Sequence, residues 1–260
     1  MAISPELFQI PGIAVKFTKA GLTSEIVLDL MRGREDRNMI SDAKKILPQF
    51  EKETPVILEG IENLKENGLI AFNHPDNNVL IPAFLTLALK LDELKGKQIN
   101  LVMASEIEVS SKYNLKTALP GSALFIERFH KLYGGNIIST PTVQKRSDYL
   151  SGRAIALRQV INRLKAGQII AIAPEGHTET NEEISPSETF HEGSGSIARL
   201  ASSFKLPTVP VGLWKDEKGI NIKIGSPIYN FPQDNKDAVI KLMSVISQNL
   251  PLNLRGPFKI

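Results

Sequence analysis

The hydrophobic residues of this chain occur in short β-branched runs, and several of these runs end abruptly in polar turns. The clearest runs span residues 69–72, 169–173 and 208–213. Runs of this length and composition are typical of buried strands. Between them, apolar residues recur at helical spacing, over residues 79–89 and 155–164. Strands that alternate with helices predict βαβ units and an α/β fold.

The residues at either end of the chain have a helical pattern. Residues 1–54 carry two apolar stripes at helical spacing, and Gly33 is the expected break between them. Such stripes usually pack on the protein core, and contact with a lipid surface is the alternative. Near the other end, the spacing of apolar residues in 239–246 predicts a last helix.

Two of the predicted strands end in residues that can carry chemistry. Residues 69–72 lead into Asn73-His74-Pro75-Asp76-Asn77-Asn78, and residues 169–173 lead into Pro174-Glu175-Gly176. Taken singly, each segment is explained as an ordinary turn. The carboxyl ends of strands in α/β sheets are where ligands bind, and histidine exchanges protons near neutral pH. The two segments together therefore predict that His74 and Glu175 share one cleft.

These motifs resemble those of the lysophospholipid and glycerol-phosphate acyltransferase family. In that family a strand ending in Asn-His opens the site, and a strand ending in Pro-Glu-Gly closes it about a hundred residues later. Further similar segments are 58–64, 193–201, 209–212 and 222–228. The resemblance implies an α/β fold with a mixed, largely parallel sheet flanked by helices. It divides the chain into an N-terminal helical segment, residues 1–54, and an acyltransferase-like domain, residues 55–260.

The resemblance also implies an activity, namely transfer of a fatty acyl group from an acyl thioester to a hydroxyl of a glycerolipid-type acceptor. His74 is the implied general base. Glu175 is expected to bind acceptor hydroxyls or to shape the pocket, together with Gly176 and His177. Neither a metal nor a tightly held cofactor is implied, because the acyl carrier, coenzyme A or acyl carrier protein, is itself a substrate.

The chain departs from the family pattern beside the histidine. Where the family has Asp after His and four further residues, this chain has Val79. That Asp orients and stabilises the imidazole in the family, so another residue must take its place. Asp76, Asn78 and Glu106 are the candidates. The missing Asp also favours the alternative to an enzyme, a catalytically impaired relative that binds lipid or a protein partner.

A second departure concerns the cation that binds the acceptor's phosphate in the family. Residues 121–128 match the family block by letters, but the spacing of apolar residues over 122–132 predicts a helix. The corresponding strand is expected at residues 136–140. At its end Ser139-Thr140-Pro141 stands where the family has Asp-Arg, so the phosphate-binding arginine is missing there. Lys145 and Arg146 are the nearest possible substitutes. We therefore expect glycerol 3-phosphate to bind poorly unless these or another cation takes over.

The amino-acid composition bears on the class of protein, on metal binding and on the cellular location. Hydrophobic residues make up 42% and charged residues 23% of the 260 residues, as in ordinary globular proteins. The chain has no cysteine and no histidine pair at ligand spacing, which argues against a zinc site. We see no signal peptide and no membrane-spanning run, and nothing suggests a nucleic-acid partner. These features favour a cytoplasmic location, and the net charge of +3 permits peripheral contact with an anionic membrane.

Overall fold

The computed structural model describes residues 20–106, 108–110, 116–118, 121–142, 147–179 and 183–259. The strands are β1 (Val56–Glu59), β2 (Gly68–Phe72), β3 (Ile99–Ala104), β4 (Glu108–Ser110), β5 (Lys116–Ala118), β6 (Ile137–Thr140), β7 (Ile169–Ile172), β8 (Thr208–Asp216) and β9 (Gly219–Ile224). The α-helices are α1 (Ala20–Arg32), α2 (Met39–Glu53), α3 (Asn77–Lys95), α4 (Ser122–Leu132), α5 (Tyr149–Lys165), α6 (Glu192–Ser203) and α7 (Asn235–Ser247).

A seven-stranded sheet forms the centre of the molecule, with strand order β1-β9-β8-β2-β7-β3-β6. Every neighbouring pair in it is parallel except β8 and β9, which pair antiparallel. The fully buried strands β2 and β7 lie at its middle. The sheet is therefore mixed and largely parallel, as the sequence predicts. Strands β4 and β5 form a separate antiparallel pair.

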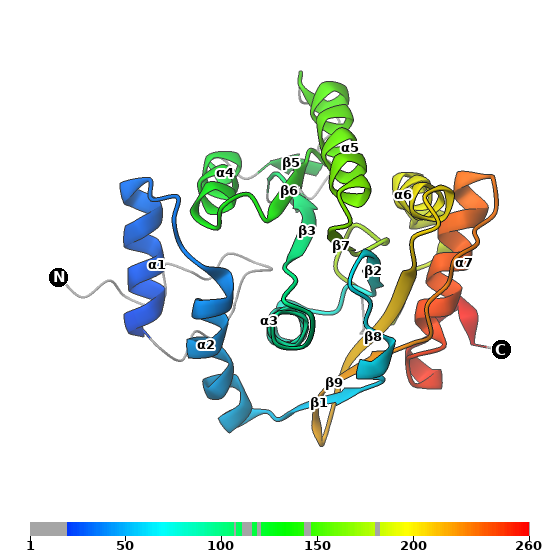
Figure 1. Ribbon diagram of the computed structural model, residues 1–260, viewed down its shortest axis with the longest axis horizontal. Helices are drawn as coiled ribbons and strands as arrows, with labels where there is room; N and C mark the ends of the chain where they lie inside the picture. Colours follow the sequence, from blue (N-terminus) through cyan, green and yellow to red (C-terminus); the bar gives the residue numbers. More distant parts are fainter. Residues whose placement is uncertain are drawn as a thin grey trace.

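Helices cover both faces of the sheet (Figure 1). One face packs on α3, whose buried residues Val79, Ala83, Leu87 and Leu91 join one hydrophobic core. The other face packs on α5, α6 and α7, whose apolar residues form a second core. Both faces of the central strands are thus buried, which explains why β2 and β7 are apolar runs without alternation.

The boundaries of most elements agree with the sequence pattern, with one difference at the last strand. The predicted helix over 122–132 and the strand at 136–140 are confirmed as α4 and β6. The last strand spans Gly219–Ile224, so it overlaps only the first part of the segment 222–228 that is similar to the family. It begins earlier because the Asp216 carboxylate accepts hydrogen bonds from the N–H groups of Lys218 and Gly219, at 2.8 and 3.2 Å, and closes a turn between β8 and β9.

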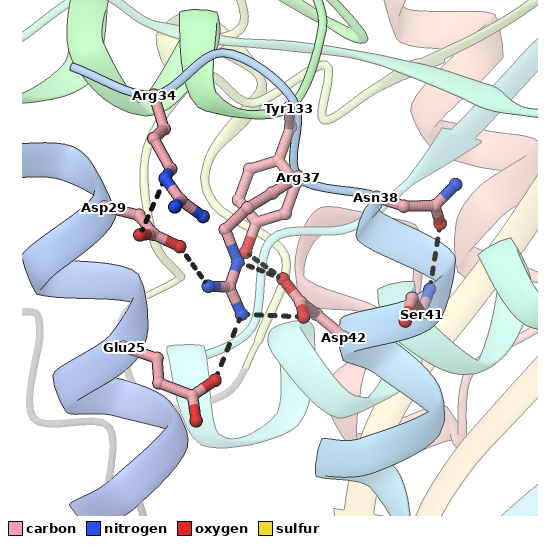
Figure 2. A network of polar contacts seen from close by, with 8 residues as sticks. All are labelled: Glu25, Asp29, Arg34, Arg37, Asn38, Ser41, Asp42 and Tyr133. Carbon is pink, nitrogen blue, oxygen red and sulfur yellow. Dashed lines mark hydrogen bonds and ion pairs between the residues drawn. The ribbon is translucent and has the colours of Figure 1, made fainter. Parts of the chain in front are cut away.

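The two N-terminal helices pack against the rest of the molecule. Ile40 of α2 belongs to the core beneath α3, and Leu30 of α1 packs with residues of α4 and its end. Arg37 joins the two helices (Figure 2). Its guanidinium donates to Asp29 at 2.6 Å and to Asp42 at 2.7 and 2.9 Å, and Tyr133 also donates to Asp42 at 3.0 Å. Because both aspartates are buried, this ion pairing holds the N-terminal helices in place.

A polar hollow of about 370 Å³ lies beside this ion-pair network. All its lining residues come from 25–45, so it includes none of the residues that the sequence predicts for a site. Among the described residues, no helix is both long enough and apolar enough to cross a membrane.

Candidate active site

The sheet brings the two predicted strand ends to the same edge. β2 and β7 are adjacent and parallel, with Ala71 level with Ile172. The chain leaves these strands through Asn73-His74 on one side and Pro174-Glu175 on the other. Since parallel strands end at one edge, the two motifs must meet there.

His74 and Glu175 are in direct contact. The Glu175 carboxylate accepts one hydrogen bond from the His74 main-chain N–H at 3.1 Å and another from the Ser185 main-chain N–H at 2.8 Å. Glu175 is 0% exposed, so both of its oxygens point into the protein. The hydrogen bond between them confirms that His74 and Glu175 are adjacent, and a cleft shared by the two stays a prediction. This geometry favours shaping of the pocket over direct contact with an acceptor as the role of Glu175.

One ring nitrogen of the His74 imidazole is enclosed by the protein. Within the described part of the chain, its buried Nδ1 has no hydrogen-bond partner. Burial lowers the pKa of the imidazole below its ordinary value of 6.5, while the nearby Glu175 carboxylate acts in the opposite direction.

The side chains proposed as partners of the imidazole have other contacts. The Asp76 carboxylate caps α3 by accepting hydrogen bonds from the N–H groups of Asn78, at 2.6 Å, and of Val79, at 3.3 Å. Asn78 lies exposed in the first turn of that helix. Glu106 accepts from the main chain of Thr142 at 2.8 Å and from the hydroxyl of Ser105. None of them satisfies Nδ1 of His74, and Val79, at the family's Asp position, is buried.

A short hydrogen-bonded ring braces the Pro-Glu-Gly turn. Nδ1 of His177 lies 2.8 Å from the Glu175 carbonyl oxygen, and Nε2 lies 2.9 Å from the Ser185 hydroxyl. A carbonyl can only accept, so Nδ1 carries the proton, and in the neutral ring Nε2 accepts from Ser185. Gly176 is required at the turn because its φ is +70° and because a Cβ there would come within 2.2 Å of the His191 ring.

Two residues that position this site do so through contacts that have no evident signal in the sequence. The side-chain amide of Asn73 pairs with both main-chain groups of Leu213 on β8, at 2.7 and 2.8 Å. It thereby continues the sheet while the backbone turns away at His74. Ser185 lies ten residues beyond Glu175, at the end of a polar loop. Asn73 belongs to the Asn-His motif and Ser185 to no motif, and in both cases only the fold reveals the contact.

Lys145 and Arg146, the predicted substitutes for the phosphate-binding arginine, lie outside the described residues. His130, on α4, contacts the Ser139 hydroxyl at 3.2 Å, which fits a structural role. No group of three or more His, Asp or Glu side chains in the described ranges is arranged to hold a metal ion. The arrangement at the sheet edge offers instead an imidazole beside a buried carboxylate, which suits proton transfer.

Comparisons with known proteins agree with this picture at the level of the family. The family model described as Acyltransferase matches residues 55–214, which is more than half of the chain. A comparison with curated proteins found no match. Among solved structures, the chain is similar to the 1-acyl-sn-glycerophosphate (LPA) acyltransferase PlsC from Thermotoga maritima, with 17% identity, 85% of each chain covered and a TM-score of 0.44. That likeness is too weak to carry an argument about the substrate. The match to the family model, over both strand-end motifs, shows that this chain belongs to the acyltransferase family.

Proposed function

We propose that the protein moves a fatty acyl group from an acyl thioester to a hydroxyl of a glycerolipid-type acceptor, with Nε2 of His74 as general base. The acceptor oxygen attacks the thioester carbonyl while its proton passes to Nε2. The carbon–sulfur bond of the resulting tetrahedral intermediate then breaks. The imidazolium returns the proton to the leaving thiolate, so the products are an ester and a free thiol.

The contact between His74 and Glu175 is the observation that carries this proposal. In place of a carboxylate on its ring, His74 is fixed through its main chain. Its N–H is bound by Glu175, and its carbonyl accepts a hydrogen bond from Glu179 N–H at 2.8 Å. The negative charge of Glu175 also favours the imidazolium that forms during transfer. Glu175 thus supplies part of what the missing Asp supplies elsewhere in the family.

Catalytic impairment is the competing proposal, and one specific observation favours it. With valine at position 79 and no partner for Nδ1 among the residues that the structure describes, none of these residues gives the imidazolium a carboxylate bonded to that nitrogen. In a serine protease, loss of the corresponding carboxylate charge costs about 10⁴ in rate. A protein of this kind would bind a lipid or a protein partner without turning over a thioester.

Release of free thiol distinguishes the two proposals. The wild-type protein is offered acyl-coenzyme A and acyl carrier protein thioesters, each with a panel of lysophospholipid and glycerol-phosphate acceptors. We expect thiol release that depends on the acceptor and matches ester formation one to one. Absence of transfer from every thioester, in a folded protein that still binds lipid, would establish the binding-protein alternative.

We further propose that residues 55–260 form the acyltransferase domain, with no resident cofactor, and that residues 1–54 serve as its helical attachment. A cytoplasmic protein that touches an anionic membrane peripherally would suit a lipid acceptor. Sedimentation with vesicles tests the membrane contact. Binding that increases with anionic lipid content supports it, and equal recovery in the supernatant at every lipid composition contradicts it.

A further inference from the structure

Arg153 on α5 has an environment unlike that of an ordinary surface cation. Its side chain is half-buried, and its guanidinium carbon lies 5.3 Å from the centre of the Tyr149 ring. Nη1 donates a hydrogen bond to the Tyr149 hydroxyl at 2.9 Å. Nη2 lies beside Gly193, where a Cβ would come within 3.1 Å of it. The guanidinium is therefore held against the Tyr149 ring, and the absence of a side chain at Gly193 leaves room for it.

The charge of Arg153 is not neutralised by the surrounding described residues. Helix α5 contains Arg153, Arg158, Arg163 and Lys165 and no acidic residue. In the described ranges, no carboxylate forms an ion pair with Arg153, and its hydrogen bond to Tyr149 leaves most of its N–H donors for a ligand. Arg37 is the opposite case, because its guanidinium is fully engaged with Asp29 and Asp42. A positioned and unneutralised guanidinium is suited to bind an anion.

The fold places this cation next to the candidate active site. Helix α5 follows β6, which runs parallel to β3, and β3 runs parallel to β7, so α5 starts at the edge of the sheet where His74 and Glu175 meet. Gly193, which lies beside the Arg153 guanidinium, is in the first turn of α6. The same turn is tied to the Pro-Glu-Gly motif, because Ser194 Oγ donates to the Pro174 carbonyl oxygen at 3.3 Å. In Figure 1, α5 and α6 lie side by side on this face of the molecule.

We propose that Arg153 binds a phosphate group of a substrate at the candidate active site. The planar guanidinium can give two parallel hydrogen bonds to phosphate oxygens, and Tyr149 keeps it in position to do so. This inference rests on the proposed function for the identity of the phosphorylated molecule. The phosphate belongs either to a phosphorylated acceptor or to the acyl donor, and the two sources present the same chemistry to Arg153.

Arg153 changes the expectation drawn from the sequence. The expected weak binding of glycerol 3-phosphate rested on the missing arginine after the strand at residues 136–140. Arg153 lies 13 residues after the last residue of that strand, Thr140, on a helix rather than in the strand-end motif. A basic residue on a helix has no motif to mark it, so its placement emerges only from the packing of α5 on α6.

Calorimetry without any acyl group tests the proposal independently of turnover. Inorganic phosphate, glycerol 3-phosphate and coenzyme A are titrated into the wild-type protein, with glycerol as the uncharged control. We expect Arg153→Gln to weaken binding of inorganic phosphate and of one of the two phosphorylated ligands by roughly tenfold or more. Arg153→Lys, which keeps the charge and loses the planar fork, should give a smaller loss. The ligand that is affected identifies the source of the phosphate.

Arg158→Gln is the matched control, because it removes the same charge from an exposed position on the same helix. It should change each dissociation constant by less than about twofold, and thermal melting verifies that all variants are folded. Equal weakening by Arg158→Gln would indicate a general charge effect and overturn the proposal. So would phosphate binding that survives Arg153→Gln and is lost in Lys145→Gln or Arg146→Gln. A protein that binds phosphate through Arg153 without transferring acyl groups would contradict the proposed function alone.

Discussion

The main-chain N–H of His74 donates a hydrogen bond to Oε2 of Glu175 at 3.1 Å, and these residues are 101 positions apart in the chain. The contact joins the ends of two buried parallel strands at the centre of the sheet. It fixes the histidine through its backbone and leaves Nδ1 of the ring without a partner among the described residues. A base oriented in this way should respond differently to changes at Asp76, Val79 and Glu175.

Substitution of Asp76 by Asn should have little effect on acyl transfer. The Asp76 carboxylate caps α3, and asparagine caps helices about as well as aspartate. We expect kcat/KM to fall by less than about threefold, with urea denaturation close to that of the wild type. Asp76→Ala, which removes the cap, should cost about 1 kcal/mol of stability. A loss of roughly 10²-fold in Asp76→Asn, with unchanged stability, would identify Asp76 as the carboxylate that orients His74.

Introduction of the family carboxylate by Val79→Asp should raise activity. Val79 is buried in the first turn of α3, and a carboxylate there could pair with the enclosed Nδ1 of His74. We expect kcat to rise by about tenfold or more and the His74 pKa, measured by NMR, to rise as well. Val79→Asn is the matched control, since it adds a polar group of similar shape without a charge. Equal rates and equal His74 pKa values in the two variants would show that position 79 does not reach the imidazole.

The pH dependence of catalysis should show a base with a lowered pKa. Burial lowers the pKa of His74 below 6.5, so the neutral, active ring persists as the pH falls past that value. We expect kcat/KM to stay level down to pH 6.5 and to decline below it. The same shift makes the contribution of His74 to stability complete above pH 6.5, and this contribution is lost as the pH falls through the folded-state pKa. An acidic limb centred above pH 6.5 would exclude this buried imidazole as the base.

Substitution of Glu175 by Gln should destabilise the protein. The carboxylate accepts from two main-chain N–H groups, and an amide has one accepting oxygen, so its NH₂ group would face one of these donors. One buried group is then left unsatisfied, at a cost of about 1–3 kcal/mol in the free energy of unfolding. Glu192→Gln, at an exposed position, is the control and should be nearly neutral. Equal stability of the two variants in chemical denaturation would contradict the role of Glu175 as a buried clamp.

The sequence predicted the strand-end part of this site because the chemistry there is local. A β-branched run followed by His74 or by Glu175 specifies a buried strand and the residue at its end, and parallel strands end together. The helical spacing over residues 122–132 also revealed that the Arg128 segment, despite its letters, is a helix rather than a strand-end motif. Periodicity was the better guide there because it reflects burial on one face.

Other features of the site depend on contacts between distant segments and could not be predicted. The pairing of Asn73 with Leu213 spans 140 positions, and Ser185 reaches Glu175 through a loop with no regular pattern. Asp76 was an ambiguous case, since the same residue type at a helix start can cap the helix or orient a histidine. Only the hydrogen bonds to Asn78 and Val79 decide between these roles.

The role of His74 as general base is tested most directly by comparing His74→Ala with the wild-type protein in thioester-dependent acyl transfer. His130→Ala is the control, because His130 lies on α4 and contacts Ser139 rather than the two motifs. We predict that His74→Ala loses transfer by roughly 10²-fold or more while its folding and its binding of the acyl carrier are retained, and that His130→Ala stays active. Turnover by His74→Ala at the wild-type rate would contradict the account.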